Sequence, residues 1–205
     1  MESIRTAVRS VMRRIARGLH AVSRGRITPN MVSYTSLLGH VGVLWSLSTH
    51  RLGLAVVFII VFGLMDALDG ELARLQKTAN AGGMLMDASF DRIKEALIYI
   101  GLTQYFIVTG NFLGIRLSIV TLAGSMLVSY VKAKGETALT DGKMTANEKN
   151  RALQDGFARY EVRMAILIIA ILSHNYLNQG LALIAVLVWL TAVSRFLKIY
   201  DRLHR

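Results

Sequence analysis

Long apolar segments constrain the fold of this chain more than any other feature of its sequence. A helix needs about 20 apolar residues to cross a bilayer, and six segments come close to that length. They run from Met31 to Thr49, Leu52 to about Arg74, Gly83 to about Val108, Phe112 to Val131, about Ala158 to Ser173, and Leu181 to Leu197. With 53% hydrophobic residues and a mean hydropathy of +0.44, the chain is too apolar for an ordinary soluble domain. The sequence therefore predicts an all-α membrane protein with six transmembrane helices.

The first 27 residues have a different pattern. Apolar residues recur at helical spacing from Ile4 to Val22, and arginines occupy the remaining faces. This pattern is typical of a basic amphipathic helix that lies on an anionic membrane surface. Nucleic-acid binding and a cleaved targeting peptide are alternatives, but neither fits a segment that leads directly into a membrane span. We expect an interfacial helix over residues 1–27 and a six-helix transmembrane domain over 28–205.

A helix start is expected where these two parts meet. Thr28 is suited to the N-cap position, and Pro29, the single proline of the chain, is suited to the first helical turn.

The distribution of positive charge predicts the orientation in the membrane. Of 24 Lys and Arg residues, Arg51 and Arg116 alone accompany the connections between the first and second and between the third and fourth spans. Almost all the others lie in the N-terminal segment, the Asp-rich connection, the polar connection from Lys132 to Phe157, and the C-terminus. The positive-inside rule then places both termini of this multi-pass cell-membrane protein in the cytoplasm.

Four aspartates stand close together in the sequence between Met65 and Asp91. Residues three and four apart share one face of a helix, so Asp66 and Asp69 line a first helix while Asp87 and Asp91 line a second. Carboxylates that face each other repel unless cations lie between them, and an all-oxygen cluster suits a hard ion such as Mg²⁺ or Mn²⁺. Solvated surface carboxylates are the alternative, but acidic residues beside apolar membrane segments are costly and usually functional. Small residues next to the cluster leave room for a ligand.

The full pattern reads D-x-x-D-G-x-x-A-R, eight residues, then G-x-x-x-D-x-x-x-D. It resembles the signature of the CDP-alcohol phosphotransferase family, also called CDP-alcohol phosphatidyltransferases. The matching positions are Asp66, Asp69, Gly70, Ala73, Arg74, Gly83, Asp87 and Asp91. The resemblance implies a membrane enzyme that transfers a phosphatidyl group from CDP-diacylglycerol to an alcohol and releases CMP. It also implies dependence on Mg²⁺ or Mn²⁺, two ions in all, and a homodimer.

Roles follow from this resemblance residue by residue. It implies that the four aspartates are metal ligands and that Asp91 is also the general base that accepts the proton of the alcohol. The residues that it assigns to the nucleotide and the CDP-lipid are Pro29, Asn30, Met31, Val32, Gly70, Ala73, Arg74 and Asn80. Asn80 stands where many relatives have Thr or Ser.

The acceptor is predicted from basic residues near the cytoplasmic ends of helices. The segment from Ser129 to Lys134 resembles the end of the fourth helix in phosphatidylinositol phosphate synthases, which use inositol phosphate. The candidates for binding its phosphate are Lys132, Lys134, Arg163 and Arg195. However, Tyr160 stands where those synthases have an acceptor-binding Arg, so glycerol 3-phosphate, the acceptor of phosphatidylglycerol phosphate synthases, remains an alternative.

Two other classes of protein remain open at this point. A membrane cation transporter would also place acids in membrane helices, although near the midplane. A non-catalytic membrane scaffold would need no acidic cluster. No nucleic-acid partner is expected.

Overall fold

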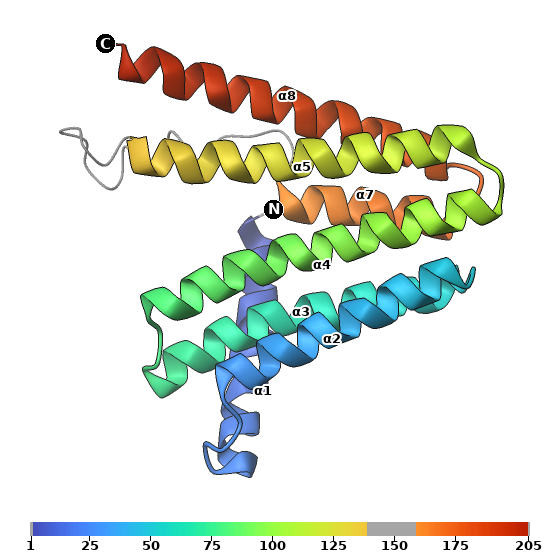
Figure 1. The fold of residues 1–205 in the computed structure, drawn as a ribbon. Coiled ribbons are helices and arrows are strands. Elements are labelled where there is room, and N and C mark those ends of the chain that lie inside the picture. Colours follow the sequence, from blue (N-terminus) through green and yellow to red (C-terminus); the bar gives the residue numbers. More distant parts are fainter. Residues whose placement is uncertain (1, 139–158, 205) are drawn as a thin grey trace. The chain divides into compact units, whose positions relative to one another are not determined.

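The computed structural model describes residues 2–138 and 159–204, which form seven helices and no strand (Figure 1). The helices are α1 (Glu2–Ser23), α2 (Pro29–Ser48), α3 (Leu52–Gln76), α4 (Ala81–Val108), α5 (Phe112–Ala138), α7 (Tyr160–Leu172) and α8 (Leu177–Leu203). The expected all-α fold is confirmed. The chain divides into two compact units, residues 1–101 and 102–205, and α4 contributes to both.

In the first unit, α2 packs along α3 (Figure 1). Two glycines of α2 make this close approach possible. A Cβ atom at position 39 would lie 2.1 Å from the ring of Phe62, and one at position 42 would lie 2.7 Å from the ring of Phe58. The two rings also contact each other edge to face, with centroids 5.6 Å apart. Gly39 and Gly42 therefore form the surface that receives two aromatic side chains of α3.

Helix α1 packs against α3 in the same unit. Its apolar side chains Met12 and Ala16 are buried, whereas Val11 and Ile15 are about half exposed. The connection to α2 is held by Gln76 of α3, whose Nε2 donates a hydrogen bond of 2.8 Å to the carbonyl of Ile27. This part of the chain is therefore packed onto the unit and not only adjacent to it.

The start of α2 is as the sequence predicts. Thr28 is the N-cap, its Oγ1 accepts a hydrogen bond of 3.3 Å from the backbone N–H of Met31, and the proline is the first helical residue.

In the second unit, α8 packs against both α5 and α7. Leu181, Ile184 and Val188 of α8 are fully buried, as are Leu167 and Ile171 of α7. Apolar side chains that recur three and four residues apart thus supply the core of this unit.

One sequence expectation needs correction here. The polar connection was expected to begin at Lys132, but α5 continues to Ala138. An ion pair one helical turn apart, with 3.7 Å between Lys132 Nζ and Glu136 Oε1, supports these additional turns. Residues 139–158, the remainder of that connection, lie outside the described residues.

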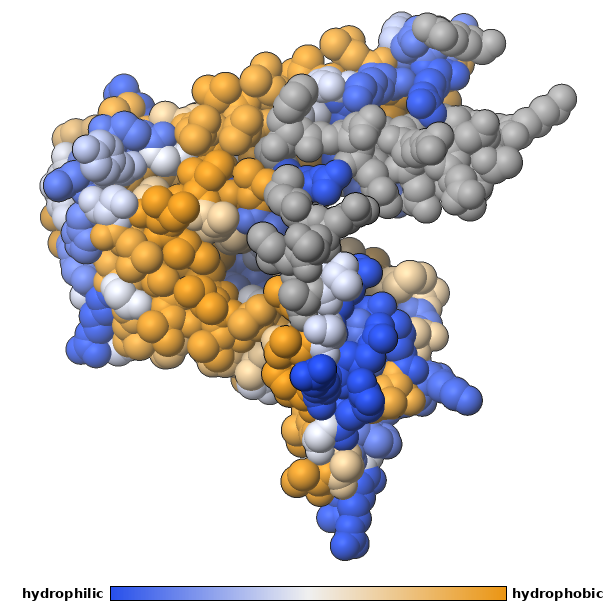
Figure 2. Space-filling view, turned by 180° about the vertical axis from the view of Figure 1, so that it is seen from behind, coloured by the Kyte–Doolittle hydropathy of each residue, from blue (hydrophilic) through white to orange (hydrophobic). Residues whose placement is uncertain are grey.

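Three helices of the described chain, α3, α5 and α8, are long and apolar enough to cross a membrane. On the face shown in Figure 2, hydrophobic side chains cover much of the helical surface, and hydrophilic atoms gather over α1 at the bottom of the view. Large apolar side chains such as Leu38, Val108 and Ile169 are more than half exposed. An exposed apolar surface of this kind suits contact with lipid.

Candidate active site

The four aspartates lie on two neighbouring helices of the first unit. Asp66 and Asp69 belong to the second half of α3, and Asp87 and Asp91 belong to the first half of α4. Their environments differ: Asp69 is only 7% exposed, Asp66 and Asp91 are partly exposed, and Asp87 is exposed. The first turns of α4 thus leave one carboxylate open to solvent while α3 holds another inside the unit.

Two serines of α2 fix the carboxylates of α3. Ser33 Oγ donates a hydrogen bond of 2.6 Å to Asp69 Oδ2. Ser36 Oγ lies 2.9 Å from Asp66 Oδ1 and 2.8 Å from the carbonyl oxygen of Phe62. Both serines are buried, and their spacing of three residues places them on the same face of α2. Hydrogen bonds of this kind orient carboxylates that bind a cation.

A lysine lies between the carboxylates of the two helices. Lys94 Nζ is 2.5 Å from Asp66 Oδ1 and 3.2 Å from Asp91 Oδ1. The lysine residue is 1% exposed, so its charge is compensated by these carboxylates and not by water. One oxygen from α3 and one from α4 therefore converge on a single cation.

The contacts of Lys94 bear on whether the site fits the divalent ion that the aspartates predict. The ammonium group is a cation in contact with oxygens of the type that Mg²⁺ and Mn²⁺ prefer, so the donor set fits a hard ion. Within residues 2–138 and 159–204, no three acidic or histidine side chains are gathered as closely as the ligands of one ion. The ammonium group of Lys94 lies between the carboxylates of Asp66 and Asp91. The sequence assigns the ion to Asp66, Asp69, Asp87 and Asp91, and of these Asp66 and Asp91 share the contact with Lys94.

Arg74 lies one helical turn beyond Gly70 on α3. Its Nε donates a hydrogen bond of 3.1 Å to the carbonyl of Gly70, and its guanidinium is largely exposed. Among the described residues, the guanidinium is also the one group within 4 Å of the position that a Cβ of Gly70 would occupy, at 3.3 Å. The surface beside Gly70 is thus open to a ligand that Arg74 can contact.

A buried glutamate links Arg74 to α1. Glu71 is 5% exposed, with its Oε1 at 3.6 Å from Arg74 Nη2 and its Oε2 at 3.3 Å from Arg13 Nε. One carboxylate therefore bridges an arginine of α1 and an arginine near the aspartates.

Of the other residues assigned to the nucleotide, Ala73 lies near the end of α3 and the rest lie at helix starts. Pro29, Asn30, Met31 and Val32 form the first turn of α2, where Val32 is buried and Asn30 and Met31 are exposed. Asn80 precedes α4, and its Oδ1 accepts a hydrogen bond of 2.8 Å from the N–H of Gly83. In the structure Asn80 therefore caps a helix.

The four basic residues predicted for the acceptor belong to the second unit. Arg163 of α7 is buried, and its Nη1 donates a hydrogen bond of 2.5 Å to Ser125 Oγ. Arg195 of α8 is 8% exposed, and its Nη1 donates a hydrogen bond of 3.1 Å to the carbonyl of Val128. Both arginines thus reach α5. Lys132 and Lys134, near the end of α5, are exposed.

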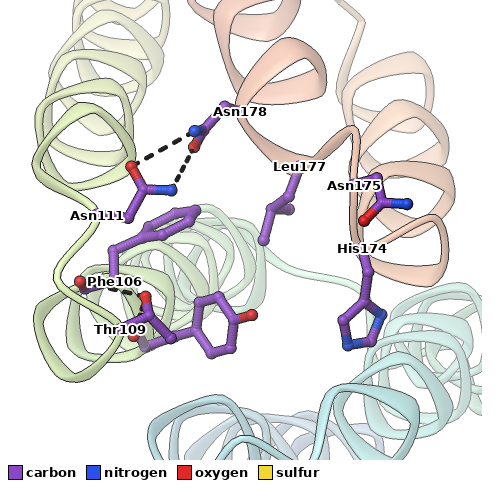
Figure 3. Close-up of a pocket in the computed structure, with 8 residues that line it drawn as sticks. Phe106, Thr109, Asn111, His174, Asn175, Leu177 and Asn178 are labelled. Carbon is purple, nitrogen blue, oxygen red and sulfur yellow. Dashed lines mark hydrogen bonds between the residues drawn. The ribbon is translucent and has the colours of Figure 1, made fainter.

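The second unit also contains a cavity of about 230 Å³ with a partly polar lining (Figure 3). It lies where α4 ends, α5 begins, and a turn joins α7 to α8. Asn111 and Asn178 face each other across these helices and exchange amide hydrogen bonds of 3.3 and 3.4 Å. The lining includes none of the residues predicted for the site, and the amide pair ties the residue before α5 to the first turn of α8.

Sequence reasoning did not find four of the residues at the aspartate site: Ser33, Ser36, Glu71 and Lys94. A signal for the serines is present, because two small polar residues stand three positions apart in the first half of a largely apolar helix. For Lys94 the signal is its position three residues after Asp91, which places both on one face of α4.

Comparison with known proteins agrees with the aspartate pattern. The profile of the CDP-alcohol phosphatidyltransferase family matches residues 26–196. The chain is similar to an archaetidylinositol phosphate synthase of Pyrococcus horikoshii, with 30% identity over 204 residues that cover 100% of this chain and 98% of the relative.

The fold is similar to that of the Mycobacterium tuberculosis phosphatidylinositol phosphate synthase. Its structure with CDP-DAG bound has a TM-score of 0.77 and 25% identity, and covers 93% of this chain and 94% of that one. Its structure with manganese and citrate has a TM-score of 0.75 and 26% identity, and covers 92% and 88%.

These matches decide between the classes of protein that the sequence left open. The family consists of phosphotransferases that depend on a metal ion, so the chain is neither a cation transporter nor a scaffold. Because the family profile covers most of the chain and a relative matches its whole length, the protein belongs to the CDP-alcohol phosphatidyltransferase family.

Proposed function

We propose that the protein transfers a phosphatidyl group from CDP-diacylglycerol to inositol phosphate and releases CMP. The observation that carries this proposal is that Asp66 and Asp91 both contact one cationic group, the ammonium of Lys94. This contact lies beside the open surface at Gly70 and Arg74. The names of similar proteins support it, because they include archaetidylinositol and phosphatidylinositol phosphate synthases. A CDP-lipid is bound in the similar structure from M. tuberculosis.

In the proposed reaction, a hydroxyl oxygen of the acceptor attacks the lipid-side phosphorus of the donor. A new oxygen–phosphorus bond forms as the bond from this phosphorus to the bridging diphosphate oxygen breaks, and CMP leaves. Asp91 accepts the proton of the attacking hydroxyl. Divalent ions, two in our proposal, would neutralise the diphosphate and orient it when bound by the four aspartates.

The remaining residues of the donor site bind and orient the substrate. Arg74 contacts the diphosphate, and Gly70 with Ala73 leaves room for the nucleotide. The first turn of α2, from Pro29 to Val32, and Asn80 border the nucleotide. Ser33 and Ser36 hold Asp69 and Asp66 in place for the reaction.

We assign the phosphate of the acceptor to Lys132, Lys134, Arg163 and Arg195. A doubly charged phosphate monoester requires several fixed cations, whereas neutral inositol or zwitterionic serine requires fewer. The burial of Arg163 and Arg195 supports the assignment, because buried arginines are held in fixed positions. Glycerol 3-phosphate satisfies the same charge argument and is the second candidate acceptor.

The apolar helices and the membership in this family indicate a membrane protein. We propose six spans formed by α2, α3, α4, α5, α7 and α8, with both termini in the cytoplasm. Residues 1–27 would lie on the cytoplasmic surface and residues 28–205 would form the catalytic domain. We also propose a homodimer.

The proposal is tested with purified protein, Mg²⁺ and CDP-diacylglycerol. Inositol phosphate, glycerol 3-phosphate, serine and inositol are supplied as single acceptors and then in pairs. CMP release and the mass of the lipid product are measured, and the expected preference is for inositol phosphate. CDP-archaeol serves as a second donor, because a relative of matching length is an archaetidylinositol phosphate synthase.

Each outcome of this test has a distinct meaning. A preference for glycerol 3-phosphate would refute the assignment of inositol phosphate and leave the mechanism standing. A preference for serine would refute the argument from cationic residues. Release of CMP at an undiminished rate in the presence of a chelator would refute the metal centre.

A further inference from the structure

Lys94 is the residue of the aspartate site for which the proposed reaction has no role. It lies on α4 one helical turn after Asp91, and its ammonium contacts carboxylates of both helices. Lysines are rarely buried as deeply as this one unless their charge is paired. The contacts therefore account for its burial, but they also place a positive charge where a divalent ion would bind.

We propose that Lys94 is a positioning residue of the metal centre. This proposal rests on the proposed function. Its ammonium holds the carboxylates of Asp66 and Asp91 in position before a divalent ion binds. The same ammonium competes with the first ion for their oxygens. The ion enters as the ammonium leaves these two oxygens.

The geometry supports competition more than coexistence. The nitrogen lies 2.5 and 3.2 Å from the two oxygens, and an Mg²⁺ ion would approach the same oxygens to about 2.1 Å. Two cations cannot both take these positions, and their mutual repulsion is strong at a site that excludes much of the water. Binding of the ion therefore includes the loss of two ion pairs, which lowers the affinity of the protein for the metal.

Burial supports the positioning role. Without metal and without Lys94, the carboxylates of Asp66 and Asp91 would face each other with no cation between them, and a partly buried charge that has lost its partner destabilises a protein. A divalent ion supplies the missing charge, so it should stabilise a variant lacking the ammonium more than it stabilises the wild type. The two roles thus predict opposite effects of one substitution: lower stability without metal and higher affinity for metal.

The test measures binding of Mn²⁺ to the full-length protein in detergent micelles, from the electron paramagnetic resonance signal of the free ion. Lys94→Met removes the charge and keeps the length of the side chain, and Lys94→Arg keeps the charge. Lys198→Met removes a charge from an exposed lysine of α8 and is the matched control. The Kd of Lys94→Met should fall by about tenfold or more, because the competing cation is gone. The other two variants should stay within about threefold of the wild type.

Thermal unfolding gives the second measurement. Lys94→Met should unfold at a lower temperature than the wild type without metal, and saturating Mn²⁺ should raise its Tm more than that of the wild type. An unchanged or weaker affinity for Mn²⁺ in Lys94→Met would overturn the proposal. If this variant does not accumulate as folded protein, Lys94→Gln, prepared in Mn²⁺ and then dialysed, takes its place. Failure of both variants to fold even in Mn²⁺ would also overturn it, since the ion would then not replace the ammonium.

A parallel arm separates this proposal from the metal centre itself. Asp66→Asn should weaken Mn²⁺ binding relative to the wild type. If the wild type does not bind Mn²⁺, or if Asp66→Asn binds it equally well, the metal centre is refuted and the role of Lys94 is refuted with it. If Asp66→Asn weakens binding while Lys94→Met leaves it unchanged, the metal centre stands and only the role of Lys94 is refuted.

Discussion

Replacing Ser33 with alanine should impair the metal centre without disturbing the fold. Ser33 Oγ donates a hydrogen bond of 2.6 Å to the carboxylate of Asp69, a residue that is 7% exposed. A hydrogen bond to a charged group contributes about 1.5–3 kcal/mol. If that energy serves to hold Asp69 in the orientation that binds the ion, its loss should weaken metal affinity by about 10- to 100-fold.

Two other hydroxyls of α2 calibrate this prediction. Ser36→Ala should have a smaller effect, because the single hydroxyl hydrogen of Ser36 is shared between Asp66 at 2.9 Å and the carbonyl of Phe62 at 2.8 Å. Thr35→Ala should have no effect on the metal, since its exposed hydroxyl bonds to the carbonyl of Met31 on the same helix.

The assay follows CMP release from CDP-diacylglycerol as the Mg²⁺ concentration is varied, together with direct Mn²⁺ binding. Ser33→Ala should require about 10- to 100-fold more metal for half-maximal activity, and excess metal should restore much of its rate. Wild-type metal affinity in Ser33→Ala would refute the reasoning. An equal loss in Thr35→Ala would refute it as well, because the effect would then belong to the helix and not to the hydrogen bond.

Three further predictions follow from the described contacts. Asp91→Asn should abolish CMP release while the affinity for the CDP-lipid, measured by calorimetry, largely survives; a parallel loss of both would refute the role of Asp91 as the base and leave it only as a ligand. Arg195→Ala should raise the KM for the acceptor far more than the KM for CDP-diacylglycerol, and equal increases in steady-state kinetics would count against an acceptor role. Gly39→Ala should lower stability by about 1–3 kcal/mol, because its Cβ would meet the ring of Phe62, and Phe62→Leu should recover part of that loss in thermal unfolding experiments.

The sequence predicts the helices of this protein well because membrane length and apolar composition leave few alternatives. The N-cap at Thr28 is predicted for a local reason, since it depends on a few neighbouring residues. The end of α5 is not predicted, because a run of charged residues after Val131 resembles a loop although Lys132 and Glu136 pair along a helix.

The aspartate pattern identifies the family, but it does not reveal the contacts that hold the site. The roles of Ser33 and Lys94 depend on which faces of α2, α3 and α4 meet, and this is decided by packing. Taken alone, Lys94 is one more positive charge near a membrane border. Its place between two carboxylates becomes visible only when the helices are in position.

The ion pair between Arg13 and Glu71 limits which segments of this protein can be deleted or exchanged. Deleting residues 1–27 would remove more than a membrane anchor: it would uncover the part of α3 that Met12 and Ala16 cover, and it would take Arg13 away from the buried carboxylate of Glu71. Arg13 is largely exposed but Glu71 is buried, so removing Arg13 takes away a partner of a buried carboxylate and should lower stability. A chimera that imports the first helix of a relative must therefore import the matching surface of α3 as well. The two segments are interchangeable between family members only as one piece.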